Sequence, residues 1–178
     1  MFDTHTMYLE RLGTKCGDYV LEKVLRHDRI RTCYLAVGND AQSYEIQLFE
    51  ESYYWSNSVH DSIEAYVAAL HQQALPKTLA IVDSGYGSGG EPYLVSHKPS
   101  QGTLLSEILD RRRIIDLEQS LKIGIQVSAI LADMHSKNLF HGCLSPRNII
   151  IEQDGAVLAD IATGYVATLA SKAGSECA

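Results

Sequence analysis

The sequence has few cysteines, and they show no paired spacing. Cys16, Cys33, Cys143 and Cys177 are scattered along the chain, with no CxxC or CxH arrangement. Zinc sites need ligands at short, regular spacings, and small disulfide-rich folds need a denser cysteine framework. The pattern argues against both classes of protein. It predicts free thiols in a reducing compartment.

Positive charge is also scarce. Lys and Arg number 15 against 22 Asp and Glu, so the formal net charge is −7. An acidic chain is poorly suited to non-specific binding of nucleic acid or of anionic membranes. The one basic run, at 111–113, is too short to change this and is interpreted as a solvated helix entry. We therefore expect no nucleic-acid partner.

Long apolar runs and targeting signals are missing as well. The start, MFDTHTMYLE, has no basic region followed by an apolar one, so it does not look like a signal peptide. No stretch approaches the roughly 18 apolar residues of a membrane-spanning helix. The hydrophobic fraction of 46% is nevertheless enough for a buried core. These features predict a cytoplasmic protein without a membrane span.

What is present is an ordered series of short apolar segments. β-Branched and aromatic runs separated by polar turns predict strands at 18–25, 31–39, 43–50, 78–87 and 92–98. Three- and four-residue apolar spacing predicts helices at 56–75, 103–110 and 116–138, and a hairpin follows at 148–161. Ser58 or Asp61 is expected to cap the first helix, and 164–174 is either a last helix or a frayed tail. Strands followed by helices predict an α+β protein with two lobes.

The stretch HSKNLFHGCLSPRNIIIEQDGAVLADIA, residues 135–162, resembles the protein kinase family. It follows the pattern H-R-D-L-K-P-E-N and, later, D-F-G. The matching positions are His141, Leu144, Pro146, Asn148 and Asp160. Upstream, VLRHDRIRTCYLAV fits the glycine-rich segment and YEIQLF fits V-A-I-K, so the resemblance covers about 17–165. Gly142 leaves open the small-molecule kinases, which often have H-G-D.

This resemblance implies a protein kinase-like two-lobe α+β fold. Its N-lobe, 1–98, would hold a five-stranded antiparallel sheet and one helix, and 99–178 would be a partial helical C-lobe. Only eighteen residues follow Asp160, so the C-lobe looks truncated, either because the chain is a fragment or because it kept half of the lobe. A truncated lobe would leave an apolar face uncovered. The candidates for that face are Ile114, Ile115, Val127 and Leu139.

Several positions that serve catalysis in kinases hold other residue types here. The three glycine positions are Arg26, Asp28 and Arg31. The two arginines would either hold an anion or form a solvent-facing charged hairpin. The lysine that binds the α- and β-phosphates falls on Gln47, a neutral amide. The alanine before it falls on Glu45.

The catalytic loop is altered too. The aspartate that accepts the substrate proton falls on Cys143, and the lysine after it on Ser145. Cys143 is interpreted as a buried inert thiol, the alternative being a nucleophile activated by His141. Asn148 and Asp160 match the two metal ligands of the family. They are the candidate cofactor- and metal-binding residues, the alternative being structural hydrogen bonding.

These substitutions lead to the expectation of a pseudokinase that is not an enzyme and has no cofactor. Its function would be that of a protein-binding scaffold or regulatory subunit, with a protein partner or a second copy on the uncovered face. The alternatives are a nucleotide-sensing pseudokinase, a structural dimerising subunit, or an enzyme with a relocated lysine. For that lysine the candidates are Lys15, Lys23 and Lys98.

Overall fold

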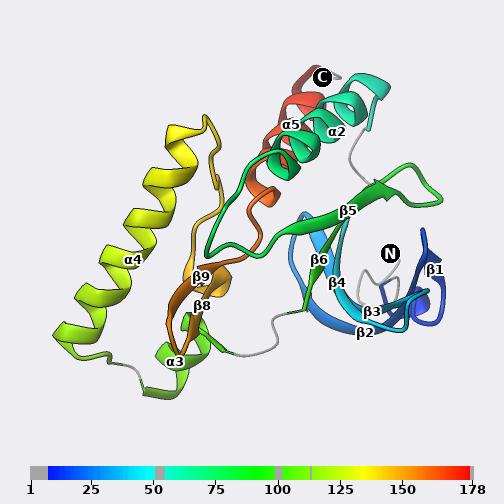
Figure 1. Ribbon diagram of the computed structural model, residues 1–178. Coiled ribbons are helices and arrows are strands. Elements are labelled where there is room, and N and C mark those ends of the chain that lie inside the picture. The colour runs from blue at the N-terminus through cyan, green and yellow to red at the C-terminus, as the bar shows by residue number, and fades with distance from the viewer. Residues whose placement is uncertain (1–7, 51–54, 99–101, 113, 177–178) are drawn as a thin grey trace. The chain divides into compact units, whose positions relative to one another are not determined.

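The computed structural model describes residues 8–50, 55–98, 102–112 and 114–176 (Figure 1). The chain forms two compact units. The first consists of the chain up to Glu64, Ile81–Lys98 and the residues from Leu169 onward; the second consists of Ala65–Ala80 and Pro99–Thr168. The expected division into 1–98 and 99–178 stays a prediction.

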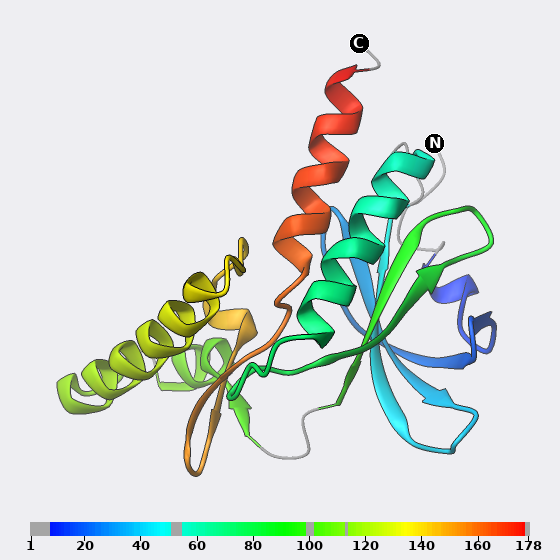
Figure 2. The same cartoon turned by 45° about the horizontal axis from the view of Figure 1, so that its top comes forward.

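The first unit is built on a curled antiparallel sheet with the order β1-β2-β3-β4-β6-β5 (Figure 2). Its strands are β1 (Lys15–Cys16), β2 (Tyr19–His27), β3 (Arg31–Gly38), β4 (Ser43–Phe49), β5 (Ile81–Tyr86) and β6 (Pro92–His97). Five of them are the expected strands, and the two-residue β1 adds a sixth at the edge. The turn at 38–42 is closed by the N–H of Gly38, which donates to the carbonyl of Gln42 at 3.0 Å.

The two faces of this sheet differ in character, because successive side chains of a strand point to opposite sides. One face is an apolar core shared by β1–β4 and β6, made of Cys16, Leu21, Tyr34, Ala36, Tyr44, Ile46, Leu48, Tyr93 and Val95. On the other face Gln47 of β4 lies between Cys33 of β3 and Leu94 of β6. By the same register, Glu45 of β4 and Arg31 of β3 share this side of the sheet with Gln47, so we call it the polar face.

Helix α2 spans Asn57–His71, and its residues Ile63, Val67 and Leu70 are buried as the spacing predicts. The expected cap is wrong: the Oγ of Ser56, not Ser58 or Asp61, accepts the N–H of Val59 at 3.4 Å. The serine two residues earlier precedes the first helical turn and so faces its unpaired N–H groups.

The second unit combines a small sheet with helices. Its elements are β7 (Thr103–Leu104), α3 (Leu105–Arg112), α4 (Leu117–Ser136), a 3₁₀ turn (Pro146–Asn148), β8 (Ile149–Glu152), β9 (Gly155–Leu158) and the start of α5 (Thr163–Glu176). The strand order is β7-β8-β9. Residues 103–104, expected to be helical, are extended because they pair with Ile150 and Ile151 of β8.

Helix α4 begins at an N-cap, where the Oδ1 of Asp116 accepts the N–H of Gln119 at 2.8 Å. The sequence pattern put its apolar residues on one helical register, but the structure divides them between two faces. Ile123, Val127, Ile130 and Met134 are buried, and α4 lies against β9. The other face carries Leu117, Leu121 and Ile125, which are exposed.

The residues expected on an uncovered apolar face are therefore partly wrong. Ile114 is exposed, but Val127 and Leu139 are buried and Ile115 is half-buried. Sequence periodicity counts apolar residues without showing which side of a helix meets the sheet, and α4 has enough of them for two sides. Among the helices of the described residues, none is long and apolar enough to cross a membrane.

Candidate functional site

The turn between β2 and β3, where a glycine-rich loop was expected, is held by one carboxylate. The Oδ1 of Asp28 accepts the N–H groups of Ile30 at 3.0 Å and of Arg31 at 3.2 Å. The N–H of Asp28 in turn donates to the carbonyl of Arg31 at 3.0 Å. An aspartate that bonds to the backbone of its own turn stabilises a tight turn without glycine. Asp28 is thus a structural residue of this loop.

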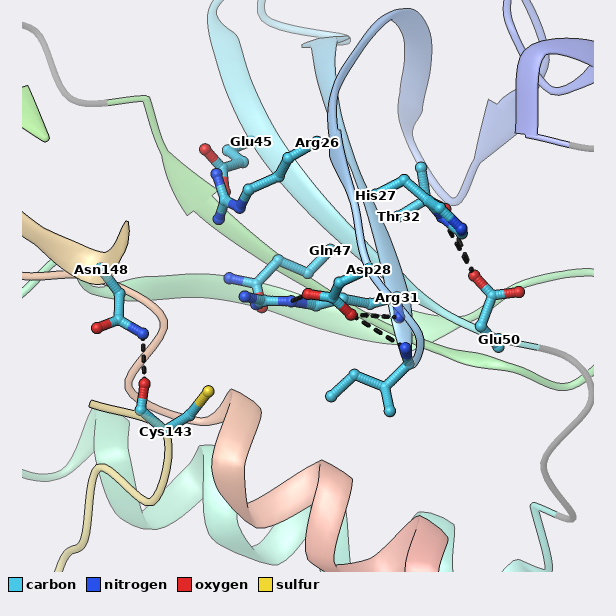
Figure 3. Close-up of polar contacts among 11 residues, drawn as sticks. Arg26, His27, Asp28, Arg31, Thr32, Glu45, Gln47, Glu50, Cys143 and Asn148 are labelled. Carbon is cyan, nitrogen blue, oxygen red and sulfur yellow. Dashed lines mark hydrogen bonds and ion pairs between the residues drawn. The ribbon is translucent and has the colours of Figure 1, made fainter. Parts of the chain in front are cut away.

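Arg31 and Gln47 meet on the polar face of the sheet (Figure 3). Arg31 is 5% exposed and Gln47 is 1% exposed. The Nη1 of Arg31 donates to the Oε1 of Gln47, and its Nε donates to the Oδ2 of Asp28 at 3.4 Å. The alternative of a solvent-facing charged hairpin is therefore wrong for Arg31, because pairing with a carboxylate and an amide allows the guanidinium to be buried.

A second arginine on this face has a carboxylate partner of its own. The Nη2 of Arg26 lies 2.5 Å from the Oε1 of Glu45, and the side chains are 29% and 12% exposed. Glu45 is the residue expected where kinases have a small apolar side chain. Its charge is neutralised by Arg26, so the position is occupied by an ion pair.

In the second unit, the loop histidine is turned toward the backbone. The Nδ1 of His141 accepts the N–H of Cys143 at 3.4 Å, and its Nε2 is bonded to the carbonyl of Ala159 at 2.9 Å. The ring is buried. Both ring nitrogens bond to backbone groups, so the geometry favours the interpretation of Cys143 as an inert thiol over that of an activated nucleophile.

Asn148 organises the loop that precedes it. Its Oδ1 accepts the N–H of Ser145 at 2.8 Å, and its Nδ2 donates to the carbonyl of Cys143 at 2.5 Å (Figure 3). Ser145 caps the 3₁₀ turn through its own Oγ, which accepts the N–H of Arg147. This reciprocal arrangement is a capping box. Both polar atoms of the Asn148 amide are therefore used to hold the loop.

Gly142 is required by close packing in the same loop. It has a φ of 68°, and its backbone lies against that of Gly164 at the start of α5. A Cβ on Gly164 would come within 2.4 Å of Gly142, so Gly164 has no room for a side chain, and a Cβ on Gly142 would lie 3.1 Å from Gly164. The glycine that suggested small-molecule kinases thus has a local structural reason.

Asp160 follows β9 in a left-handed conformation, with a φ of 62°. It is buried, and its carbonyl accepts the N–H of Thr163 at 3.1 Å at the start of α5. A left-handed aspartate is uncommon and costs conformational energy. Within the described residues no group of three or more His, Cys, Asp or Glu side chains is placed to hold a metal ion. The metal-binding roles of Asn148 and Asp160 stay predictions.

The candidates for a relocated lysine lie at the surface of the protein. Lys15, Lys23 and Lys98 are all exposed. The buried cation on the polar face is Arg31, which falls on one of the three glycine positions of the family pattern. The sequence held a signal for the approach of Arg31 to Gln47, because a hairpin of 31–39 and 43–50 places the first residues of one strand near the last residues of the other.

Comparison with known proteins gives a consistent family. A model described as protein tyrosine and serine/threonine kinase matches residues 42–166. The serine/threonine-protein kinases TNNI3K of Mus musculus and Rattus norvegicus are each 29% identical over 118 residues. That match covers 65% of this chain and 14% of the length of those proteins.

Solved structures support the fold. The Mycobacterium tuberculosis PknI kinase domain superposes with a TM-score of 0.70 at 16% identity, over 84% of this chain and 60% of that one. A structure titled PpkA-294 apo form gives a TM-score of 0.64 at 15% identity, over 90% and 64% of the two chains. The α+β two-lobe fold expected from the sequence, with its partial helical lobe, is confirmed by this likeness.

The comparisons also correct one expectation. The chain was expected not to be an enzyme, on the strength of Gln47, Cys143 and Ser145. The matching family model describes protein kinases, and the curated relatives are named as kinases, so that expectation is wrong. With residues 42–166 covered by the model, the chain belongs to the protein tyrosine and serine/threonine kinase family.

Proposed function

We propose that this kinase-family domain acts as a regulatory, protein-binding unit that associates with a second copy of itself through helix α4. The observation that carries the proposal is an exposed apolar stripe on that helix. Leu117, Leu121 and Ile125 are 75%, 57% and 70% exposed. Large apolar side chains gathered on one exposed face are typical of interaction surfaces.

The stripe lies on the side of α4 that points away from its buried face. Residues four apart are neighbours on a helix, so Leu117, Leu121 and Ile125 form one continuous row. The buried row of α4 is shifted round the helix by about half a turn, at 100° per residue. Helix α4 thus contacts its own unit with one row of side chains and presents a second row to solvent.

Along the exposed face of α4, large side chains lie toward the N-terminal end and small ones toward the C-terminal end. The small residues are Gly124, Ser128 and Ala132, all exposed, and nothing lies within 4 Å of a Cβ built on Gly124. In an antiparallel pair of α4 helices centred between residues 124 and 125, each large side chain meets a small one. Leu117 faces Ala132 and Leu121 faces Ser128.

This self-complementarity favours a second copy as the partner. A two-fold symmetric interface requires the same patch to fit itself, so a graded row of large and small residues must run in opposite directions on the two copies. The small residues leave room for the leucines of the opposite copy, so the two helix backbones can approach closely.

The native mass tests the proposal. Sedimentation equilibrium of the chain should give twice its mass of 19.7 kDa. Leu121→Asp should shift the protein to a monomer, because a carboxylate buried in an apolar interface is strongly unfavourable. The matched control is Leu9→Asp, since Leu9 is 52% exposed and lies outside the stripe. A monomeric wild type, or equal dissociation by both variants, would contradict the proposal.

A second candidate function is regulatory binding of a nucleotide to the first unit. The observation that favours it is the cation on the polar face of the sheet, Arg31, which bonds to the residue matched to the kinase lysine. The two candidates use different units and are tested separately.

A further inference from the structure

The start of the chain packs on the apolar face of the first unit's sheet. We call residues 8–16 the N-terminal strap. Its last residue, Cys16, belongs to the apolar core, and Tyr8 packs against that core. The N–H of Gly13 donates to the carbonyl of Leu21 on β2 at 2.7 Å. The strap is therefore attached to the sheet through both its backbone and its side chains.

A buried ion pair joins the strap to the turn between β5 and β6. The Nη1 of Arg11 lies 2.7 Å from the Oε1 of Glu91, whose side chain is 0% exposed. The Oε2 of Glu91 accepts the N–H of Gly89 at 2.9 Å, and its carbonyl accepts the N–H of Gly87 at 2.8 Å. A buried carboxylate requires a cation and hydrogen-bond donors. Glu91 finds the cation in the strap and the donor in its own turn.

The same turn bonds to helix α2. The Nε2 of His60 donates to the carbonyl of Gly90 at 3.0 Å, and Gly90 directly precedes Glu91. The ring of His60 lies 4.0 Å, centroid to centroid, from the ring of Tyr86 at the end of β5. The hydroxyl of Tyr86 is 3.1 Å from the carbonyl oxygen of His60 and 3.0 Å from the Oε1 of Glu64. The first half of α2 is thus held by the turn and by the end of β5.

These contacts form one continuous route within the first unit. It runs from Arg11 to Glu91, through the turn, and from Gly90 to His60. Three of the four residues at 87–90 are glycines, and Gly90 has a φ of 82°. Glycine gives a backbone wide conformational freedom, so the shape of this turn depends on the contacts that fix it. A change at the strap should therefore reach α2 through the turn.

We propose that the N-terminal strap sets the position of helix α2 through the β5–β6 turn, with the ion pair of Arg11 and Glu91 as its latch. When the pair is formed, the turn presents the carbonyl of Gly90 to His60. When the pair is broken, the turn and the first half of α2 open more often. This conformational device lies within the first unit and goes beyond the proposed function, because it depends neither on association through α4 nor on nucleotide binding.

Hydrogen exchange of the whole chain, followed by mass spectrometry, tests the proposal. Arg11→Gln leaves the buried carboxylate without its cation. Exchange should become about tenfold faster or more in the strap, in the turn at 87–91 and in α2 at 60–64. Helix α4, which belongs to the other unit, should keep its wild-type rate. Arg29→Gln is the matched control, because it removes the charge of an exposed arginine outside the strap and should leave all these rates unchanged.

A second variant interrupts the route at its far end. His60→Phe keeps a ring beside Tyr86 but removes the hydrogen bond to Gly90. In that background, Arg11→Gln should still speed up exchange in the strap and the turn. Helix α2 should show no further response, since the turn is no longer bonded to it.

The outcomes distinguish coupling from a general loss of stability. Wild-type exchange of α2 in Arg11→Gln would overturn the proposal, and so would an acceleration of α4 as large as that of α2. An equal effect of Arg29→Gln, or a response of α2 in the His60→Phe background, would overturn it too. Should Arg11→Gln not fold, His60→Phe alone is the test, because energetic coupling is reciprocal. Exchange of the strap should then rise, and an unchanged strap would contradict the proposal.

Discussion

At the scale of single residues, Asn148 shows that a side chain at a family motif position can serve to hold the backbone of its own loop. Asn148 is 2% exposed and bonds to Ser145 and to Cys143 through its two amide atoms. The family pattern identified the position as a metal ligand. The structure adds a role in the loop that the pattern alone did not reveal, because hydrogen bonds to backbone depend on the path of the chain.

We predict that Asn148→Ala lowers the free energy of unfolding by about 1–3 kcal/mol, since two partly buried backbone groups would lose their partner. Urea unfolding followed by circular dichroism measures this. The neighbouring Arg147→Ala is the control, because Arg147 is exposed. Equal stability of Asn148→Ala and the wild type would show that the loop does not depend on the amide.

At the scale of elements, helix α4 packs within its own unit through one row of side chains and carries the row proposed for association on its other side. Its apolar positions were recognised from sequence, but their division into two rows was not. The buried row includes Met134, which is 0% exposed, while Leu121 of the other row is 57% exposed. Both rows of α4 contain large apolar residues, so the two rows are distinguished only by what packs against each of them.

Substituting one residue from each row should change stability by very different amounts. Met134→Ala leaves a cavity and is expected to cost about 2–5 kcal/mol. Leu121→Ala, measured at concentrations where the chain is monomeric, should change stability by about 0.5 kcal/mol or less. Chemical denaturation of both variants decides the matter. A large loss for Leu121→Ala in the monomer would mean that this row is covered within the chain itself.

At the scale of the whole molecule, buried acids predict a loss of stability in alkali. Burial raises the pKa of Cys16, Tyr34 and Tyr93 to about 12 each, from ordinary values of 9.0 for cysteine and 10.0 for tyrosine. The unfolded chain therefore releases these protons at lower pH than the folded one. The stability that these three groups contribute is fully present below about pH 9 and is lost as the pH rises toward 12.

Melting temperatures measured between pH 7 and pH 11 should decline above pH 9. Tyr34→Phe removes one of the titrating groups, and the decline in this variant should be shallower. The hydroxyl of Tyr34 also donates to the carbonyl of Tyr8 at 3.1 Å, so the variant is compared by slope and not by its melting temperature at neutral pH. A melting temperature that stays constant to pH 11 would contradict the burial of these groups.

The sequence by itself determined the family, the order of strands and helices and the identity of the replaced catalytic positions. Periodicity and ordered motifs are local properties of a chain, so His141, Asn148 and Asp160 were found without coordinates. Tertiary structure decided which side chains meet across strands and which face of α4 is buried. The contact of Arg31 with Gln47 joins residues sixteen positions apart. It exists because an antiparallel register brings them together, and register depends on the packing of the whole sheet.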